Sequence, residues 1–130
     1  MNKVQYWITA AEKDWVVAGH LQEKKDYAYA LFFGHLTLEK LLKGYYVKIT
    51  GQHPPMSHRL IYLAEKSGLN LSDSQTELLE IVTDFNLEAR YPDEKFTFHK
   101  KCTQEFTANY LKQIEDMKSW LLQKMKSWEI

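Results

Sequence analysis

Apolar residues recur through most of the chain at steps of three and four, the repeat of an α-helix that buries one face. The broadest of these stretches runs from Asp26 to Ile49 and predicts a central helix that packs on several sides. With only five Gly, three Pro and no stretch of alternating Val, Ile and Thr, the chain offers few strands or hairpin turns. The sequence therefore predicts an all-α fold.

Residues typical of helix ends divide this pattern. Gly51 before a Pro pair suits a left-handed C-cap, Ser72 and Gln75 have the spacing of a capping box, and Pro92 disfavours helix at the residue before it. The predicted helices run from Val4 to about residue 23, from about Asp26 to Ile49, from His58 to Ser67 with Ser57 as cap, from Ser72 to about Arg90, and through Phe106 to as far as Trp128, with 91–101 as a loop. The expected product is an antiparallel up-and-down bundle of four to five helices.

Composition fits one compact domain over residues 1–130, because 45% hydrophobic residues can build a core without disulfides or metals. Lys+Arg and Asp+Glu both number 17, so any nucleic-acid site must be local. The single Cys102 cannot form an internal disulfide, and the first residues lack the apolar run of a signal peptide or membrane span. We expect a cytoplasmic protein without a membrane segment. No His or Cys spacing indicates a metal, and no motif indicates a cofactor.

Four short stretches of the sequence carry a resemblance to a known family. They are Tyr6-Trp7 with residues 10–14, residues 38–44 (LEKLLKG), residues 54–60 (PPMSHRL) and residues 89–93 (ARYPD). With these four stretches in this order and at this spacing, the chain resembles the HEPN (higher eukaryotes and prokaryotes nucleotide-binding) family over nearly its whole length. The resemblance is to the small prokaryotic stand-alone members in particular.

The resemblance implies an antiparallel helical bundle that dimerises and is often encoded beside a minimal nucleotidyltransferase in toxin–antitoxin pairs. Some members are ribonucleases that use an Arg followed four to six residues later by a His. Here the first His after Arg90 is His99, nine residues on, and Arg59 has no His at that spacing either. The resemblance therefore favours a noncatalytic member and leaves enzymatic activity open.

Arg59 and Arg90 are the only arginines, and both lie in these stretches. Because the planar guanidinium suits phosphate, Arg90 is a candidate phosphate ligand; alternatively it bonds the carbonyl end of its helix or pairs with Asp93. His58 is either a proton-transfer group or phosphate ligand, or only a residue that bonds the turn. His35, in the apolar stripe, is expected in the core.

A basic face is the third element of the candidate site. Lys40 and Lys43 lie three residues apart, although Lys43 can instead pair with Glu39 at i,i+4. Phe96 and Phe98 can stack on a base or pack in the bundle. The candidate nucleotide- or phosphate-binding residues are Arg90, Tyr91, Asp93, His58, Arg59, Lys40, Lys43 and Lys95.

We therefore expect a noncatalytic protein that binds a nucleotide, a minimal nucleotidyltransferase partner, or both. The alternatives are a metal-independent endoribonuclease that acts as a dimer on RNA, with Arg90 and His58 as its catalytic residues, and a protein-interaction scaffold without a small ligand. Aromatic residues such as Trp120 and Trp128 suggest a homodimer through the terminal helices. The binding hypothesis requires Arg59 and Arg90 to reach the same anion.

Overall fold

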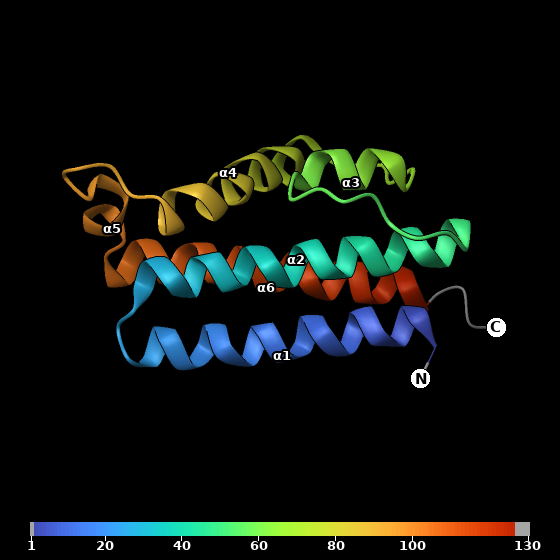
Figure 1. Cartoon of the computed structure of the whole chain (residues 1–130), viewed down its shortest axis with the longest axis horizontal. Coiled ribbons are helices and arrows are strands. Elements are labelled where there is room, and N and C mark those ends of the chain that lie inside the picture. Colours follow the sequence, from blue (N-terminus) through green and yellow to red (C-terminus); the bar gives the residue numbers. More distant parts are fainter. Residues whose placement is uncertain (1, 127–130) are drawn as a thin grey trace.

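The computed structural model describes residues 2–126, which contain helices and no strand. The helices are α1 (Lys3–Glu23), α2 (Tyr27–Thr50), α3 (Leu60–Lys66), α4 (Asp73–Arg90), α5 (Thr97–Lys101) and α6 (Gln104–Lys126). In the view of Figure 1, α1 lies on one side, α2 and α6 in the middle, and α3 and α4 on the other side, with α5 at one end. No helix of the described part is long and apolar enough to cross a membrane.

The central helix predicted from the sequence is α2. It packs against every other helix, and Leu31, Leu38, Leu41 and Leu42 have no exposed surface. The prediction of an all-α antiparallel bundle is thus confirmed. Two of the helix-end signals are confirmed as well: Gly51 has a left-handed backbone with φ 70°, and the capping box of α4 forms between Ser72 and Gln75.

The third helix begins at Leu60, so its predicted start at His58 is wrong. The Ser57 Oγ accepts a hydrogen bond from the backbone N–H of Arg59 at 3.1 Å, and the N–H of Leu60 donates to Thr83 Oγ1 at 3.2 Å. These bonds hold Arg59 in an extended conformation as the N-cap of α3. His58 and Arg59 consequently precede the helix, where their side chains have more freedom to reach other elements.

The segment 91–101, predicted as a loop, contains the short helix α5. Asp93 stabilises its start, because its carboxylate accepts hydrogen bonds from Thr97 N–H at 2.8 Å and from Thr97 Oγ1–H at 2.7 Å. Phe96, which lies between Asp93 and Thr97 in the sequence, adopts a left-handed backbone with φ 54°. Phe98, inside α5, is buried. The helix predicted to reach Trp128 is described as far as Lys126, so Trp128 lies outside the described residues.

Candidate functional site

Three side chains of α2 form the base of the candidate site. Phe32, His35 and Glu39 are separated by three and four residues, so they lie on one face of the helix, which we call the α2 stripe. The stripe meets the segment before α3 at His58 and the end of α4 at Arg90. It therefore links two stretches that are more than thirty residues apart in the sequence.

Glu39 is the hub of the stripe, buried among groups that bond it. Its Oε1 accepts a hydrogen bond from Nδ1 of His58 at 2.8 Å, and its Oε2 accepts one from Nζ of Lys43 at 2.8 Å. Burial raises the pKa of this carboxyl group, but the bonds from Lys43 and His58 outweigh it, and the pKa lies below its ordinary value. Glu39 is therefore an anion held inside the protein by two donors.

His58 extends from this carboxylate towards solvent, with 60% of its side chain exposed. A carboxylate can only accept, so the bond to Glu39 places a proton on Nδ1 of His58. In the neutral ring, Nε2 then carries the lone pair. A histidine fixed in this way can accept a proton at Nε2, or donate one from it to a phosphate once the ring is charged.

His35 lies beneath His58 and is fully buried, as predicted for a core histidine. Its Nε2–H donates to the backbone carbonyl of His58 at 2.8 Å, while Nδ1 has no hydrogen-bond partner among the described residues and lies 3.9 Å from Glu39 Oε1. Burial lowers the pKa of His35 and outweighs the hydrogen bond to the His58 carbonyl and the charge of Glu39, which raise it. The lowered pKa favours the neutral ring, which anchors the segment before α3 to α2.

Arg90 is fixed at the C-terminal end of α4 by Asn86 and two aromatic rings. Its Nε–H donates to the Asn86 carbonyl at 3.1 Å and its Nη2 to Asn86 Oδ1 at 2.8 Å. The guanidinium carbon lies 5.2 Å from the ring centres of both Phe32 and Tyr91. The predicted bond of Arg90 to the carbonyl end of its own helix is thus confirmed. The side chain that Arg90 bonds is that of Asn86 and not that of Asp93. A guanidinium has five N–H donors, and the bonds to Asn86 use Nε and Nη2, so within residues 2–126 the Nη1 edge of Arg90 is unused.

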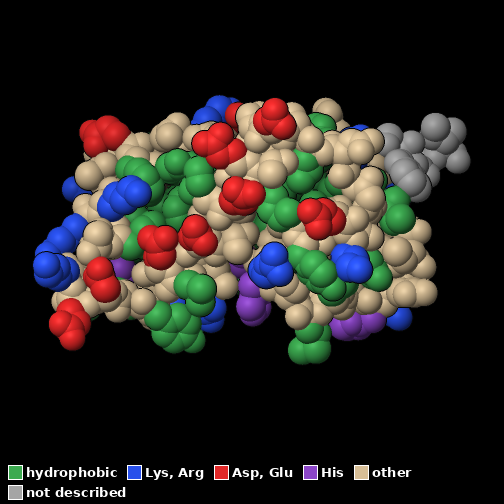
Figure 2. Space-filling model, turned by 90° about the horizontal axis from the view of Figure 1, so that it is seen from above, with side chains coloured by type: hydrophobic (Ala, Val, Ile, Leu, Met, Phe, Trp, Pro, Cys, Tyr) green, Lys and Arg blue, Asp and Glu red, His purple; other side chains and the backbone are tan. Residues whose placement is uncertain are grey.

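The other candidate cations have different surroundings. Arg59 lines a groove of about 260 Å³ between α3 and α4, together with Ile61, Thr83 and the carboxylates of Glu80 and Asp84. Figure 2 shows acidic side chains across the middle of this face. Among the described residues, none that lies beside Arg59 also contacts Arg90. The structure of one copy therefore gives no support for an anion site shared by the two arginines.

The lysines of α2 serve the bundle itself. Lys40 forms an ion pair with Asp14 of α1 at 2.6 Å, and Lys43 forms the i,i+4 pair with Glu39 that the sequence offered as the alternative. In the segment after α4, Asp93 caps α5, whereas Tyr91, Lys95 and Phe96 are exposed. Of the exposed residues in this segment, Tyr91 is the one that contacts Arg90.

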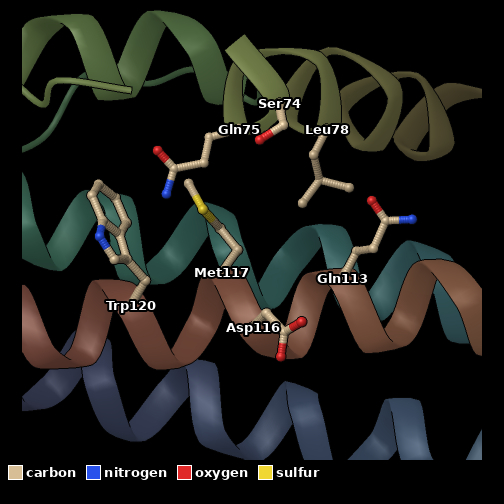
Figure 3. Close-up of a pocket in the computed structure, with 7 residues that line it drawn as sticks. All are labelled: Ser74, Gln75, Leu78, Gln113, Asp116, Met117 and Trp120. Carbon is tan, nitrogen blue, oxygen red and sulfur yellow. The ribbon is translucent and has the colours of Figure 1, made fainter. Parts of the chain in front are cut away.

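A further groove, of about 360 Å³, lies between α4 and α6 (Figure 3). Its lining residues are Ser74, Gln75, Leu78, Gln113, Asp116, Met117 and Trp120. Gln75 is used in the capping box and Asp116 pairs with Lys112 at 3.0 Å. The groove presents no cation to a phosphate, and no cluster of three or more metal-ligating side chains occurs within residues 2–126.

The buried His35 predicts a loss of stability in mild acid. The unfolded chain binds a proton at this histidine below about pH 6.5, whereas the folded ring, with its lowered pKa, takes up the proton only at a lower pH. Stability therefore falls as the pH drops from about 6.5, and Glu39, whose folded pKa is also lowered, adds to the loss below about pH 4.5. Urea titrations from about pH 7 to 5 measure this slope. The His35→Gln variant should show a flatter slope; an unchanged slope would assign the acid sensitivity to other groups.

Comparisons with known proteins agree with this architecture. The family model described as the HEPN domain matches residues 4–125. The crystal structure of TT1696 from Thermus thermophilus is similar, with a TM-score of 0.82 and 19% sequence identity, over 95% of this chain and 99% of that chain. At this identity the likeness concerns the fold alone. A search of curated proteins gives no match.

Proposed function

The chain belongs to the HEPN domain family, and we propose that it is a noncatalytic member that binds nucleotide or RNA phosphates. The proposed surface, the Arg90–His58 surface, consists of Phe32, His58, Arg90 and Tyr91. The observation that carries the proposal is the fixed guanidinium of Arg90, with its unused N–H edge. A donor held in place before binding loses little entropy when a phosphate arrives.

Two residues of α2 hold the two groups of the proposed surface. Phe32 contacts Arg90 and Glu39 bonds His58, and these two residues lie seven positions apart on one face of α2. A ligand with neighbouring phosphates, such as a polyphosphate or an RNA strand, can contact both Arg90 and His58, with exposed Tyr91 available to stack on a base.

A minimal nucleotidyltransferase encoded beside this chain is the protein partner that we propose. The support is the resemblance to small prokaryotic HEPN members, which are often paired with such enzymes. Such a partner would bring a nucleotide to the same surface. Co-purification of the two proteins, lost in a variant of the Arg90–His58 surface, would support the pairing.

A second candidate function, a metal-independent endoribonuclease, is favoured by the contact of Glu39 with His58. A buried carboxylate that orients an exposed imidazole is the usual arrangement for proton transfer. The absence of the usual ribonuclease spacing of Arg and His in the sequence is the argument against it. Absence of RNA cleavage by the purified native protein would end this alternative.

Titration with ATP, ADP, AMP and a short single-stranded RNA tests the binding proposal. We expect Arg90→Ala to weaken the tightest of these about tenfold or more, because a hydrogen bond to a charged group contributes about 1.5–3 kcal/mol. Lys13→Ala, which removes an exposed cation of α1, is the matched control and should bind as the native protein does. Equal affinity of the two variants, or no binding by the native protein, would refute the proposal.

A further inference from the structure

A small cavity of about 210 Å³ lies at one end of the bundle, where α4, α5 and α6 meet (Figure 1). Its lining includes four aromatic side chains, those of Phe85, Phe98, Phe106 and Tyr110. The ring centre of Phe85 lies 5.4 Å from those of Phe98 and Tyr110, and the rings of Phe106 and Tyr110 pack at 4.9 Å. The first two side chains are buried and the last two are half-buried. The cavity therefore has an aromatic lining that is open to solvent on one side. We call it the aromatic cavity.

Two carboxylates of α4 line the aromatic cavity as well. Asp84 and Glu88 are four residues apart, so they lie on the same face of the helix. Both are exposed, and neither forms an ion pair within residues 2–126. The pKa of Glu88 is raised, first by burial and then by the negative charge of Asp84. A cation bound between the two carboxylates would relieve their repulsion.

An ammonium group of the chain itself already lies at the aromatic cavity. Nζ of Lys101 is 5.4 Å from the ring centre of Phe106, which is the distance of a cation–π contact. This lysine forms no ion pair with Asp84 or Glu88. The contact shows that an ammonium group fits beside the ring, and it leaves one positive charge beside two negative ones.

From these contacts we propose that the aromatic cavity binds a linear aliphatic diamine, or one end of a longer polyamine. The Cβ atoms of residues four apart on a helix are about 5–6 Å apart, and a chain of four methylene groups separates two ammonium groups by a similar distance. One ammonium group pairs with Asp84 and the other with Glu88. The methylene chain lies against the half-buried rings of Phe106 and Tyr110, which also attract the charged ends.

The charge and lining of the aromatic cavity distinguish this ligand from others. The two carboxylates repel a nucleotide, and none of the lining residues belongs to the Arg90–His58 surface. An inorganic dication has the required charge but no apolar part that could use the aromatic lining. A single ammonium group, such as that of a lysine side chain, can pair with only one of the two carboxylates. The aromatic cavity is therefore a site separate from the proposed phosphate-binding surface.

An NMR titration of the full chain with putrescine, a diamine with four methylene groups, tests the site at fixed ionic strength. Saturable shifts should appear at Asp84, Glu88 and Tyr110. Butylamine, with one ammonium group, should bind about fivefold more weakly, because it lacks the second ion pair. Magnesium ions at the same concentration should not displace putrescine. Absence of saturable shifts, equal binding of butylamine, or displacement by magnesium would overturn the proposal.

Matched substitutions on α4 separate the aromatic cavity from the overall charge of the protein. Asp84→Asn and Glu88→Gln each remove one carboxylate of the cavity and should weaken putrescine binding about fivefold. Glu77→Gln removes an exposed carboxylate of the same helix that does not line the cavity, and it should bind as the native protein does. All three side chains are exposed, so each variant should fold. Equal affinity of the three variants would assign the binding to general charge and refute the site.

The lysine at the aromatic cavity provides a test of opposite sign. Lys101→Ala frees the ring of Phe106 for the ligand and removes a positive charge near Glu88, so it should strengthen putrescine binding about threefold. Lys100→Ala makes the same change of charge on the same short helix, but Lys100 does not line the cavity, so its effect should be smaller. An equal effect of the two variants, or weaker binding by Lys101→Ala, would contradict binding at this ring.

Discussion

Replacing Glu39 with alanine should lower the free energy of unfolding by about 3–5 kcal/mol, the usual cost of removing one partner from a buried ion pair. The variant leaves the ammonium group of Lys43, whose side chain is only 12% exposed, without its counter-ion. His58 loses its acceptor at the same time. Urea denaturation followed by circular dichroism measures the loss.

Two matched variants separate this effect from the general cost of losing a carboxylate. Asp116→Ala removes the partner of Lys112 in an ion pair whose two side chains are 66% and 68% exposed, and it should cost less than about 1 kcal/mol. Glu39→Gln keeps an acceptor for one donor and should fall between the two. A Glu39→Ala protein no less stable than Asp116→Ala would show that the Glu39 contacts contribute little to the fold.

Gly44→Ala should be the next most damaging change, with a loss of about 1–3 kcal/mol from overpacking. A Cβ atom at this position would lie 2.9 Å from Cβ of Trp7 and 3.1 Å from Cε of Met125. The methionine end can move, but the Trp7 Cβ is fixed to the backbone of α1. Thermal or urea unfolding measures the difference, and relief requires α1 and α2 to separate.

Gly19→Ala is the control for Gly44→Ala, because it makes the same chemical change inside a helix. A Cβ atom at Gly19 meets nothing within 4 Å. Alanine should therefore stabilise α1 by about 0.5–1 kcal/mol through its higher helix propensity. If both variants changed stability in the same direction and by the same amount, close packing at Gly44 would not be the cause.

The helices were predictable where local chemistry determines them. The apolar breadth of α2, the left-handed Gly51 and the capping box of Ser72 with Gln75 all depend on residues close in sequence. The α5 helix was missed because its cap is an Asp93 side chain acting across a left-handed Phe96, a conformation uncommon for aromatic residues. The start of α3 was missed because Thr83 of another helix determines it.

The candidate site was predictable only in part, since its contacts join distant segments. Arg90 and His58 were identified by residue type and by their place in the family-like stretches. Glu39 was considered only as a surface partner of Lys43, because no local pattern reveals a hydrogen bond to a residue nineteen positions later. Lys40 was placed in the basic face because its pairing with Asp14 depends on how α1 packs against α2.

The family assignment and the residue chemistry bear on different questions. The match over residues 4–125 establishes the family and, with it, the bundle. Function depends on particular side chains, and here the usual ribonuclease spacing of Arg and His is absent while an oriented histidine and a fixed arginine are present. His58 and Arg90, which contact the α2 stripe through Glu39 and Phe32, are the basis of the proposed phosphate binding.

The most direct test is an NMR titration of the labelled native protein with a nucleotide or short RNA, observing arginine Nε–H and histidine ring signals. We expect the Arg90 Nε–H and the ring of His58 to shift together with ligand concentration, while the ring of the exposed His53, which follows the C-terminal end of α2, stays unchanged. Shifts confined to residues of the groove between α4 and α6, with Arg90 and His58 unaffected, would contradict the proposed site.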